Sequence, residues 1–118
     1  MSPLANAIYK LLVRRLQAGR TSMTYGELTA ALPPSLTTHR RSSRLHARLG
    51  EVSEACRASG VPCLPAMVWR ADTGRPGPAY YRHAHPTLRA ESSQLDAWER
   101  EHAAVIRAGD RYARAVAS

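Results

Sequence analysis

The chain has 118 residues, 44% of them hydrophobic, which suits one domain with a single modest core. It carries 17 Lys and Arg against 9 Asp and Glu, and this net charge of +8 favours a polyanionic partner such as nucleic acid. Cys56 and Cys63 form no Cys-x-x-Cys pair, so neither a disulfide framework nor a zinc cluster is expected. The sequence shows neither a signal-peptide pattern nor about 20 consecutive apolar residues, so we expect a cytoplasmic protein without membrane contact.

Two amphipathic helices are predicted in the first third of the chain. Ser2 followed by Pro3 is a cap and first-turn signal, and apolar residues then recur at helical spacing until Gly19. Thr24 and Glu27 form a capping-box pattern, which predicts the start of a second helix. Pro33 and Pro34 are expected to end it.

A third helix is predicted from Thr37 or Thr38 to about Ser59, where Gly60 stops it. An apolar stripe and a basic sector lie side by side on it, so one side is expected to pack and the neighbouring side to be exposed. The apolar residues are Leu45, Leu49, Val52 and Cys56, and the basic ones are Arg40, Arg41, Arg44 and Arg48. Gly50 lowers helix propensity, so a break there into two shorter helices is an open alternative.

The last third is predicted to form a β-hairpin followed by a long helix. Residues 64–70 read as a short buried strand, 71–78 as a turn-rich loop and 79–81 as the return strand. A capping-box pattern at Ser93 and Asp96 opens the C-terminal helix, with a potential break at Gly109.

The expected fold class is α+β: a mainly helical winged helix-turn-helix with a small β-hairpin wing and a long C-terminal helix. We expect one domain over residues 1–118, with its core in 1–82 and a helical extension in 91–116.

The segment from Thr24 to Ala31, the basic helix and the strand from Leu64 to Arg70 with its Gly-containing loop together resemble a known DNA-binding domain. It is that of the alkylguanine DNA alkyltransferases and alkyltransferase-like proteins, and the resemblance covers roughly residues 23–81. The resemblance implies that an arginine replaces an extruded base. Arg44 matches that position best, although the cluster from Arg40 to Arg48 permits other registers.

The resemblance also places residues 65–68, Pro-Ala-Met-Val, where the family carries its nucleophilic cysteine motif. Alkyl transfer needs a thiolate and a neighbouring base, and neither Ala66 nor Met67 can supply them. Cys63, on a strand, would point away from the position of Ala66 and is a poor substitute. We therefore expect no enzyme activity, no catalytic residue and no cofactor.

The spacing of Arg41, Arg44 and Arg48 would project them from one helix face, where they could meet phosphates or guanine edges. A solvated basic face without a partner is the competing interpretation. Tyr25 could reach a phosphate or simply pack, and Arg70 and Arg75 flank the loop of the expected wing. The predicted DNA-binding residues are Tyr25, His39, Arg40, Arg41, Ser43, Arg44, Arg48, Arg70 and Arg75.

Duplex DNA is the expected partner. The alternative is a protein-interaction module, such as a small inhibitor or adaptor that presents the same basic face to an acidic surface. The C-terminal helix motivates it, because its apolar residues could exceed what a small core covers and offer a docking or homodimer face. They are Leu95, Trp98, Val105, Ile106 and Tyr112. His83 and His85 lack a third spaced ligand, so no metal site is expected.

Overall fold

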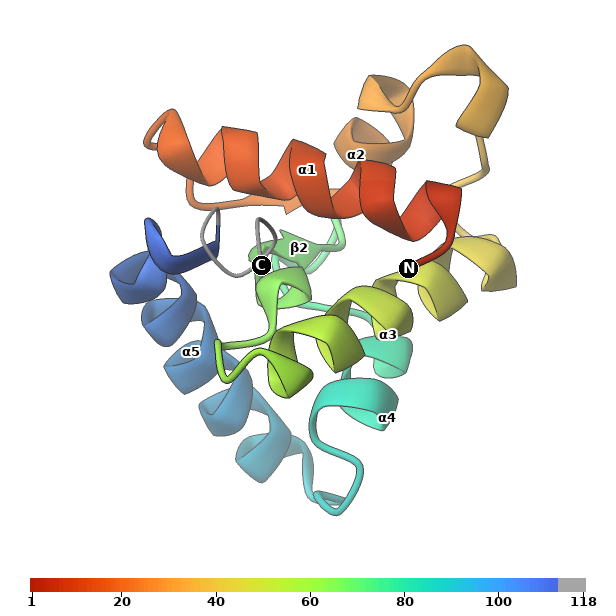
Figure 1. Ribbon diagram of the computed structural model, residues 1–118. Helices are drawn as coiled ribbons and strands as arrows, with labels where there is room; N and C mark the ends of the chain where they lie inside the picture. The colour runs from red at the N-terminus through yellow and green to blue at the C-terminus, as the bar shows by residue number, and fades with distance from the viewer. Residues whose placement is uncertain (113–118) are drawn as a thin grey trace.

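The computed structural model describes residues 1–112, and this part of the chain is mainly helical, with five α-helices and a two-stranded parallel sheet. α3 lies between α1 and α4, while α5 runs along the opposite side of the molecule (Figure 1). In chain order the elements are α1 (Pro3–Gln17), β1 (Met23–Thr24), α2 (Tyr25–Ala31), the 3-10 turn η1 (Pro34–Leu36), α3 (Ser43–Ala58), the 3-10 turn η2 (Leu64–Met67), β2 (Val68–Trp69), α4 (Pro78–Ala84) and α5 (Glu91–Ala108).

The sheet is not a hairpin, so the predicted β-hairpin wing is wrong. β2 pairs in parallel with β1, with Met23 opposite Val68 and Thr24 opposite Trp69. Residues 79–81, expected as the return strand, lie in α4 instead. Pro78 occupies the first turn of that helix, where its missing N–H costs nothing and its fixed φ suits a helix. Residues 70–77 therefore form a loop between β2 and α4 rather than the tip of a wing.

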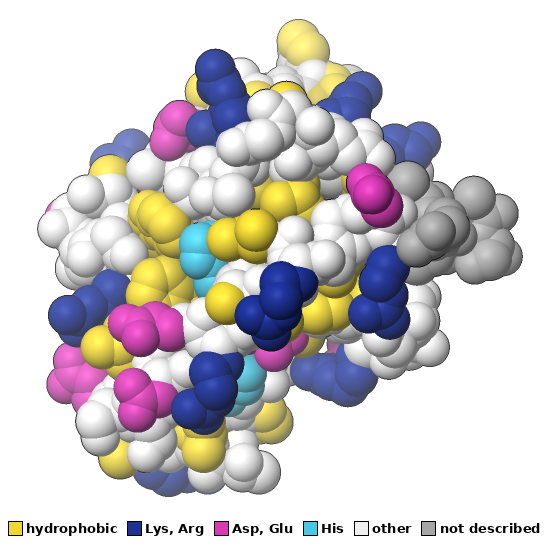
Figure 2. Space-filling view, turned by 90° about the vertical axis from the view of Figure 1, so that its left-hand side faces the viewer, with side chains coloured by type: hydrophobic (Ala, Val, Ile, Leu, Met, Phe, Trp, Pro, Cys, Tyr) yellow, Lys and Arg dark blue, Asp and Glu magenta, His cyan; other side chains and the backbone are white. Residues whose placement is uncertain are grey.

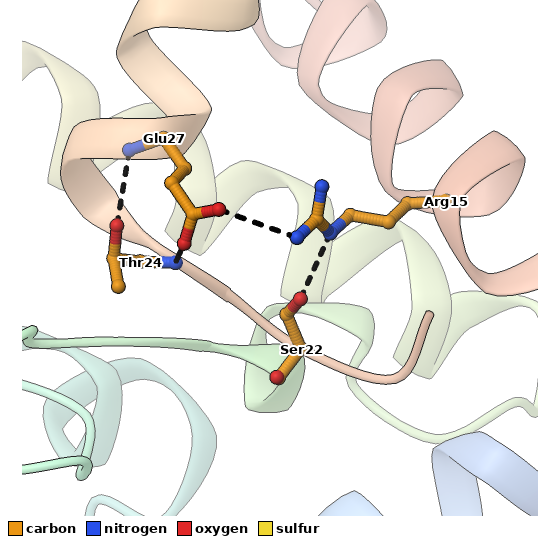
Figure 3. A network of polar contacts seen from close by, with 4 residues as sticks. All are labelled: Arg15, Ser22, Thr24 and Glu27. Carbon is orange, nitrogen blue, oxygen red and sulfur yellow. Dashed lines mark hydrogen bonds and ion pairs between the residues drawn. The ribbon is translucent and has the colours of Figure 1, made fainter. Parts of the chain in front are cut away.

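The predicted capping box fixes the start of α2 (Figure 3). The Thr24 hydroxyl accepts from the Glu27 N–H at 3.0 Å, and the Glu27 carboxylate accepts from the Thr24 N–H at 3.0 Å. Arg15 of α1 adds a third contact, because its guanidinium donates to the Ser22 carbonyl at 2.8 Å and lies 3.4 Å from Glu27. The box and Arg15 thus hold the N-terminus of α2 against α1.

α3 begins later than predicted. Its N-cap is Ser42, whose hydroxyl accepts from the Arg44 N–H at 3.2 Å, so residues 37–42 are loop. The helix runs unbroken through Gly50, and the alternative of two shorter helices is wrong. It ends at Ser59 and Gly60, where Gly60 takes a φ of +71°. The late start moves His39, Arg40 and Arg41 off the helix.

Gly50 lies where α3 faces α4. A Cβ built on it would lie 3.5 Å from the Cβ and Cδ2 of His83 in α4, which is ordinary van der Waals contact. Arg57, two turns later in α3, donates to the His83 carbonyl at 2.7 Å. α4 is therefore fastened along one flank of α3.

The C-terminal helix is confirmed as long, but it begins at Glu91 rather than Ser93, and its N-cap is Ala90. Its apolar side faces the core, where Trp98 donates its indole N–H to the Ala66 carbonyl at 2.8 Å. Tyr112 is fully buried and its carbonyl accepts from the Tyr9 hydroxyl at 2.7 Å. Residues 113–116 of the predicted extension lie outside the described residues. Within residues 1–112, no helix combines the length and apolar character needed to cross a membrane.

Candidate nucleic-acid interface

Four of the predicted site residues, Tyr25, Arg40, Arg41 and Arg70, come together around a hollow of about 600 Å³ at the N-terminus of α2. Arg40 and Arg41 reach it from the loop before α3, and Arg70 reaches it from the loop after β2. We call it the Tyr25 hollow; its lining is Thr24, Tyr25, Gly26, Arg40, Arg41, His46, Arg70, Ala71, Asp72, Gly77 and Pro78. Two loops that are 30 residues apart thus present guanidinium groups to one concave surface.

Tyr25 is the floor of this hollow rather than an exposed contact residue. Its side chain is buried, its ring packs edge-on against His46 with centroids 5.1 Å apart, and its hydroxyl accepts from the Gly77 N–H at 3.0 Å. Burial raises the pKa of Tyr25 and lowers that of His46, so both rings are neutral at pH 7. The tyrosine therefore ties the 70–77 loop to α2, and its hydroxyl hydrogen remains available to an acceptor.

A second hollow of about 650 Å³ continues from the first between α3 and α4, and we call it the α3–α4 hollow. It shares Arg41, His46 and Pro78 with the Tyr25 hollow. The exposed residues Ser43 and Ala47 form its α3 wall, and Arg82 of α4 stands opposite. Small side chains on this first turn and a half of α3 leave room for a close approach of another molecule.

Arg44 and Arg48 lie on the other flank of α3, so the predicted single arginine face does not form. Arg48 is paired with Glu51 at 2.8 Å, and the Glu51 carboxylate also accepts from the Ser2 N–H at 2.5 Å. Arg44 and Arg48 are one helical turn apart, so they project from the same side of α3, the side that faces the start of α1. The Arg44 side chain is exposed there. Arg48 thus helps to anchor the N-terminus of α1, and its pairing leaves it less free for phosphate.

His39 is exposed and lines neither hollow; its Nδ1 accepts from the Arg41 N–H at 3.0 Å, which shapes the loop. Arg75 belongs to a third hollow of about 710 Å³, on the far side of Pro78, which we call the α4 groove. The α4 groove is lined by Arg70, Thr73, Arg75, Pro76, Pro78, Tyr81, Arg82, His85, Pro86, Leu88, Arg89, Glu91, Gln94 and Leu95.

The charge of these hollows is largely uncompensated. In the described part of the chain, Arg40, Arg41, Arg82 and Arg89 have no carboxylate within ion-pair distance. Arg70 is held by Asp72 through two hydrogen bonds of 3.0 and 2.7 Å, which lower the pKa of the Asp72 carboxyl. By contrast, the face seen from the α5 side carries basic side chains scattered among acidic and hydrophobic ones (Figure 2). Arginines without a paired carboxylate therefore gather in the hollows around Pro78, where Asp72 and Glu91 are the acidic lining residues.

Neither cysteine is placed as a nucleophile. Cys56 and Cys63 are both buried, and burial raises the pKa of the Cys56 thiol to about 11 and that of Cys63 in the same direction. Ala66 and Met67 are fully buried beneath Trp98. Both thiols are thus protonated at neutral pH.

His83 and His85 both pack edge-on against the Tyr80 ring. His83 is half-buried with a buried Nδ1 that has no partner among residues 1–112, and His85 Nε2 lies 3.0 Å from the Tyr80 hydroxyl. Across the same residues, no three His, Cys, Asp or Glu side chains gather closely enough to hold a metal ion.

Sequence reasoning missed His46 and the basic residues of α4 and the segment after it, Arg82 and Arg89. They escaped because residues 79–81 were assigned to a strand, which left no element to bring Arg82 beside α3. The signal was present: Gly77 followed by Pro78 is a helix-start pattern, with Pro at the first helical position.

Comparison of the chain with protein-family models, with curated proteins and with solved structures finds no match. The resemblance to the alkyltransferases therefore stays a prediction from the residues quoted above.

Proposed function

We propose that the chain binds duplex DNA without catalysing a reaction, through the Tyr25 hollow, the α3–α4 hollow and the exposed first turns of α3. The observation that carries the proposal is the convergence of Arg40, Arg41 and Arg70 from two separate loops on one hollow. Phosphates dominate protein–DNA affinity, and the guanidinium groups of Arg40 and Arg41, which have no carboxylate of residues 1–112 within ion-pair distance, are well suited to neutralise them.

The shape of this region supports a duplex. The major groove admits an α-helix, and the end of α3 presents two small exposed side chains, Ser43 and Ala47, to the α3–α4 hollow. The loops that carry Arg40 and Arg70 lie together beside this end, where both would meet phosphates on one side of the groove. Arg44 is exposed on the other flank of the same end of α3 and is the natural residue to reach a base edge.

No described residue favours the alternative of a protein-docking face on α5. Trp98, Val105 and Tyr112 are buried in the core, and Ile106 is the one large hydrophobic residue of α5 that is exposed, at 43%. A homodimer through this helix remains a prediction without a supporting contact.

Binding of a fluorescent duplex, followed by anisotropy over a salt series, tests the proposal. Each phosphate contact contributes about −0.9 to the slope of log K against log salt. Arg40→Ala/Arg41→Ala should therefore flatten the slope by roughly 1.8 and weaken binding. The matched control is Lys10→Ala/Arg14→Ala, which removes the same charge from exposed positions on α1 and should bind like the wild type.

Equal losses in the two double variants would mean that only net charge matters and would overturn the proposal. An unchanged slope in the Arg40→Ala/Arg41→Ala variant would also overturn the proposal, since these residues would then contact no phosphate. Circular dichroism on each variant checks that the helices persist.

A further inference from the structure

The α4 groove differs in chemistry from the two hollows assigned to the duplex. Its walls come from α4, from the 70–76 loop and from the segment that leads to α5. It combines exposed guanidinium groups with a half-buried aromatic ring, Tyr81, and apolar side chains such as Leu88. At about 710 Å³ it is larger than either neighbour and falls within the range of about 300–1,000 Å³ typical of ligand sites.

Its positive charge is available to a ligand. Arg89 and Arg82 have no carboxylate of residues 1–112 within ion-pair distance, and Arg75 has only Glu91 at 3.9 Å. The Glu91 side chain is 91% exposed, so this pair is weak and Glu91 can move aside. A phosphate entering the groove would meet guanidinium groups on both walls.

The apolar part of the groove discriminates between kinds of nucleic acid. A duplex keeps its bases stacked inside and offers mainly phosphates to a surface groove, so Tyr81 and Leu88 would gain little from it. An unpaired strand can turn its bases toward such a floor, where stacking on an aromatic ring adds to phosphate contacts.

The groove is also continuous with the proposed duplex site. It shares Arg70 and Pro78 with the Tyr25 hollow and Arg82 with the α3–α4 hollow. A strand that leaves a duplex held over α3 would pass Pro78 and enter the groove directly.

We propose that the α4 groove binds an unpaired nucleic-acid strand next to the duplex, with Arg75 and Arg89 on its phosphates and Tyr81 against a base. The inference rests on the proposed function for its geometry, and it makes the preferred substrate a junction between paired and unpaired DNA.

The test compares three probes by anisotropy: a blunt duplex, the same duplex with a thymidine tail, and a thymidine strand alone. For the wild type the tail should tighten binding by about five- to tenfold or more, as expected for stacking of a base or two. Arg75→Ala/Arg89→Ala should lose this gain while binding the blunt duplex nearly as before, since both residues line only the α4 groove among the three hollows. Tyr81→Leu should lose part of the gain.

Three outcomes would overturn the inference. The tail could bring no gain, the gain could survive in Arg75→Ala/Arg89→Ala, or a tail of abasic sugars could bring the same gain as thymidine. Polyglutamate and a thymidine strand of equal charge are added as competitors; the strand should displace the tail better, and equal or better displacement by polyglutamate would identify an acidic-protein site instead.

The strand alone separates this inference from the proposed function. In one outcome, neither the wild type nor Arg75→Ala/Arg89→Ala binds the blunt duplex, and only the wild type binds the thymidine strand. The inference about the α4 groove is then supported, and the proposed duplex site is refuted. In the opposite outcome, the wild type binds the blunt duplex, the tail brings no gain in affinity and the strand alone does not bind. The proposed duplex site is then supported, and the inference about the α4 groove is refuted. Lys10→Ala/Arg14→Ala serves as the charge control in both cases.

Discussion

Replacing Gly50 by alanine should stabilise the protein. The position lies in the middle of α3 with helical backbone, where alanine is favoured over glycine by about 0.8–1 kcal/mol. The added Cβ would sit 3.5 Å from the His83 ring, which is contact without overlap, so no opposing penalty arises. We expect a gain of roughly 0.5–1 kcal/mol, or a rise in Tm of about 2–5 °C for a chain of this size.

Urea unfolding monitored by circular dichroism measures this gain as a shift in midpoint at constant m. Ala47→Gly is the matched control: it changes the same helix at an exposed position and should cost about 1 kcal/mol from propensity alone. Gly50→Val would push methyl groups into His83 and should lose about 1–3 kcal/mol. The reasoning is refuted if Ala47→Gly behaves as expected while Gly50→Ala is destabilised, since α3 and α4 would then be too close for any side chain.

Three further predictions concern stability. Thr24→Ala removes the hydroxyl of the capping box and should lower the free energy of unfolding by about 1 kcal/mol, while Thr24→Ser retains it; equal urea midpoints for the two variants would contradict this. Burial lowers the pKa of His83 to about 4, below the value of about 6.5 in the unfolded chain. The unfolded state therefore takes up a proton first as the pH falls. The free energy of unfolding should be at its full value above about pH 6.5 and should decrease between pH 6.5 and 4. The free energy of unfolding should change by at most about 1.4 kcal/mol per pH unit in this window. Urea titrations of His83→Gln should show a smaller change per pH unit, and an unchanged dependence on pH would exclude His83 as its cause. Trp98→Phe leaves the buried Ala66 carbonyl without its donor and should lower the free energy of unfolding by about 1–3 kcal/mol, measured by thermal unfolding. Trp69→Phe should lower it less, because the Trp69 ring makes no hydrogen bond in the described part of the chain.

The features predicted correctly are those decided by neighbours in sequence. The Thr24 and Glu27 side chains cap a helix through contacts three residues apart, and Ser2 and Pro3 begin α1 in the same local way. The continuity of α3 was harder to predict from the sequence, because Gly50 lowers helix propensity. In the structure Gly50 faces His83 with room for a Cβ, so no contact in the described part of the chain requires a glycine there.

The features missed depend on partners far along the chain. β2 was expected to pair with the residues after the loop, yet it pairs with β1, which lies 45 residues earlier. The arginine cluster was likewise treated as one helix face. Ser42 ends the loop and caps α3, so Arg41 turns toward Tyr25 while Arg48 turns toward Glu51. The predicted site residues therefore group differently in the structure from the single helix face that the sequence predicts.

The burial of Tyr112 determines when the fold can be completed during synthesis of the chain. Its hydroxyl donates to the Pro62 carbonyl at 2.8 Å, and its carbonyl accepts from Tyr9, so it bridges the first helix and the middle of the chain. During vectorial synthesis α1 leaves the ribosome early and must wait more than 100 residues for this partner. Until then the apolar side of α1 around Tyr9 is incompletely covered. A nascent chain stalled before Tyr112 should thus remain protease-sensitive and open to chaperones, and completion of the fold should coincide with the emergence of this one tyrosine.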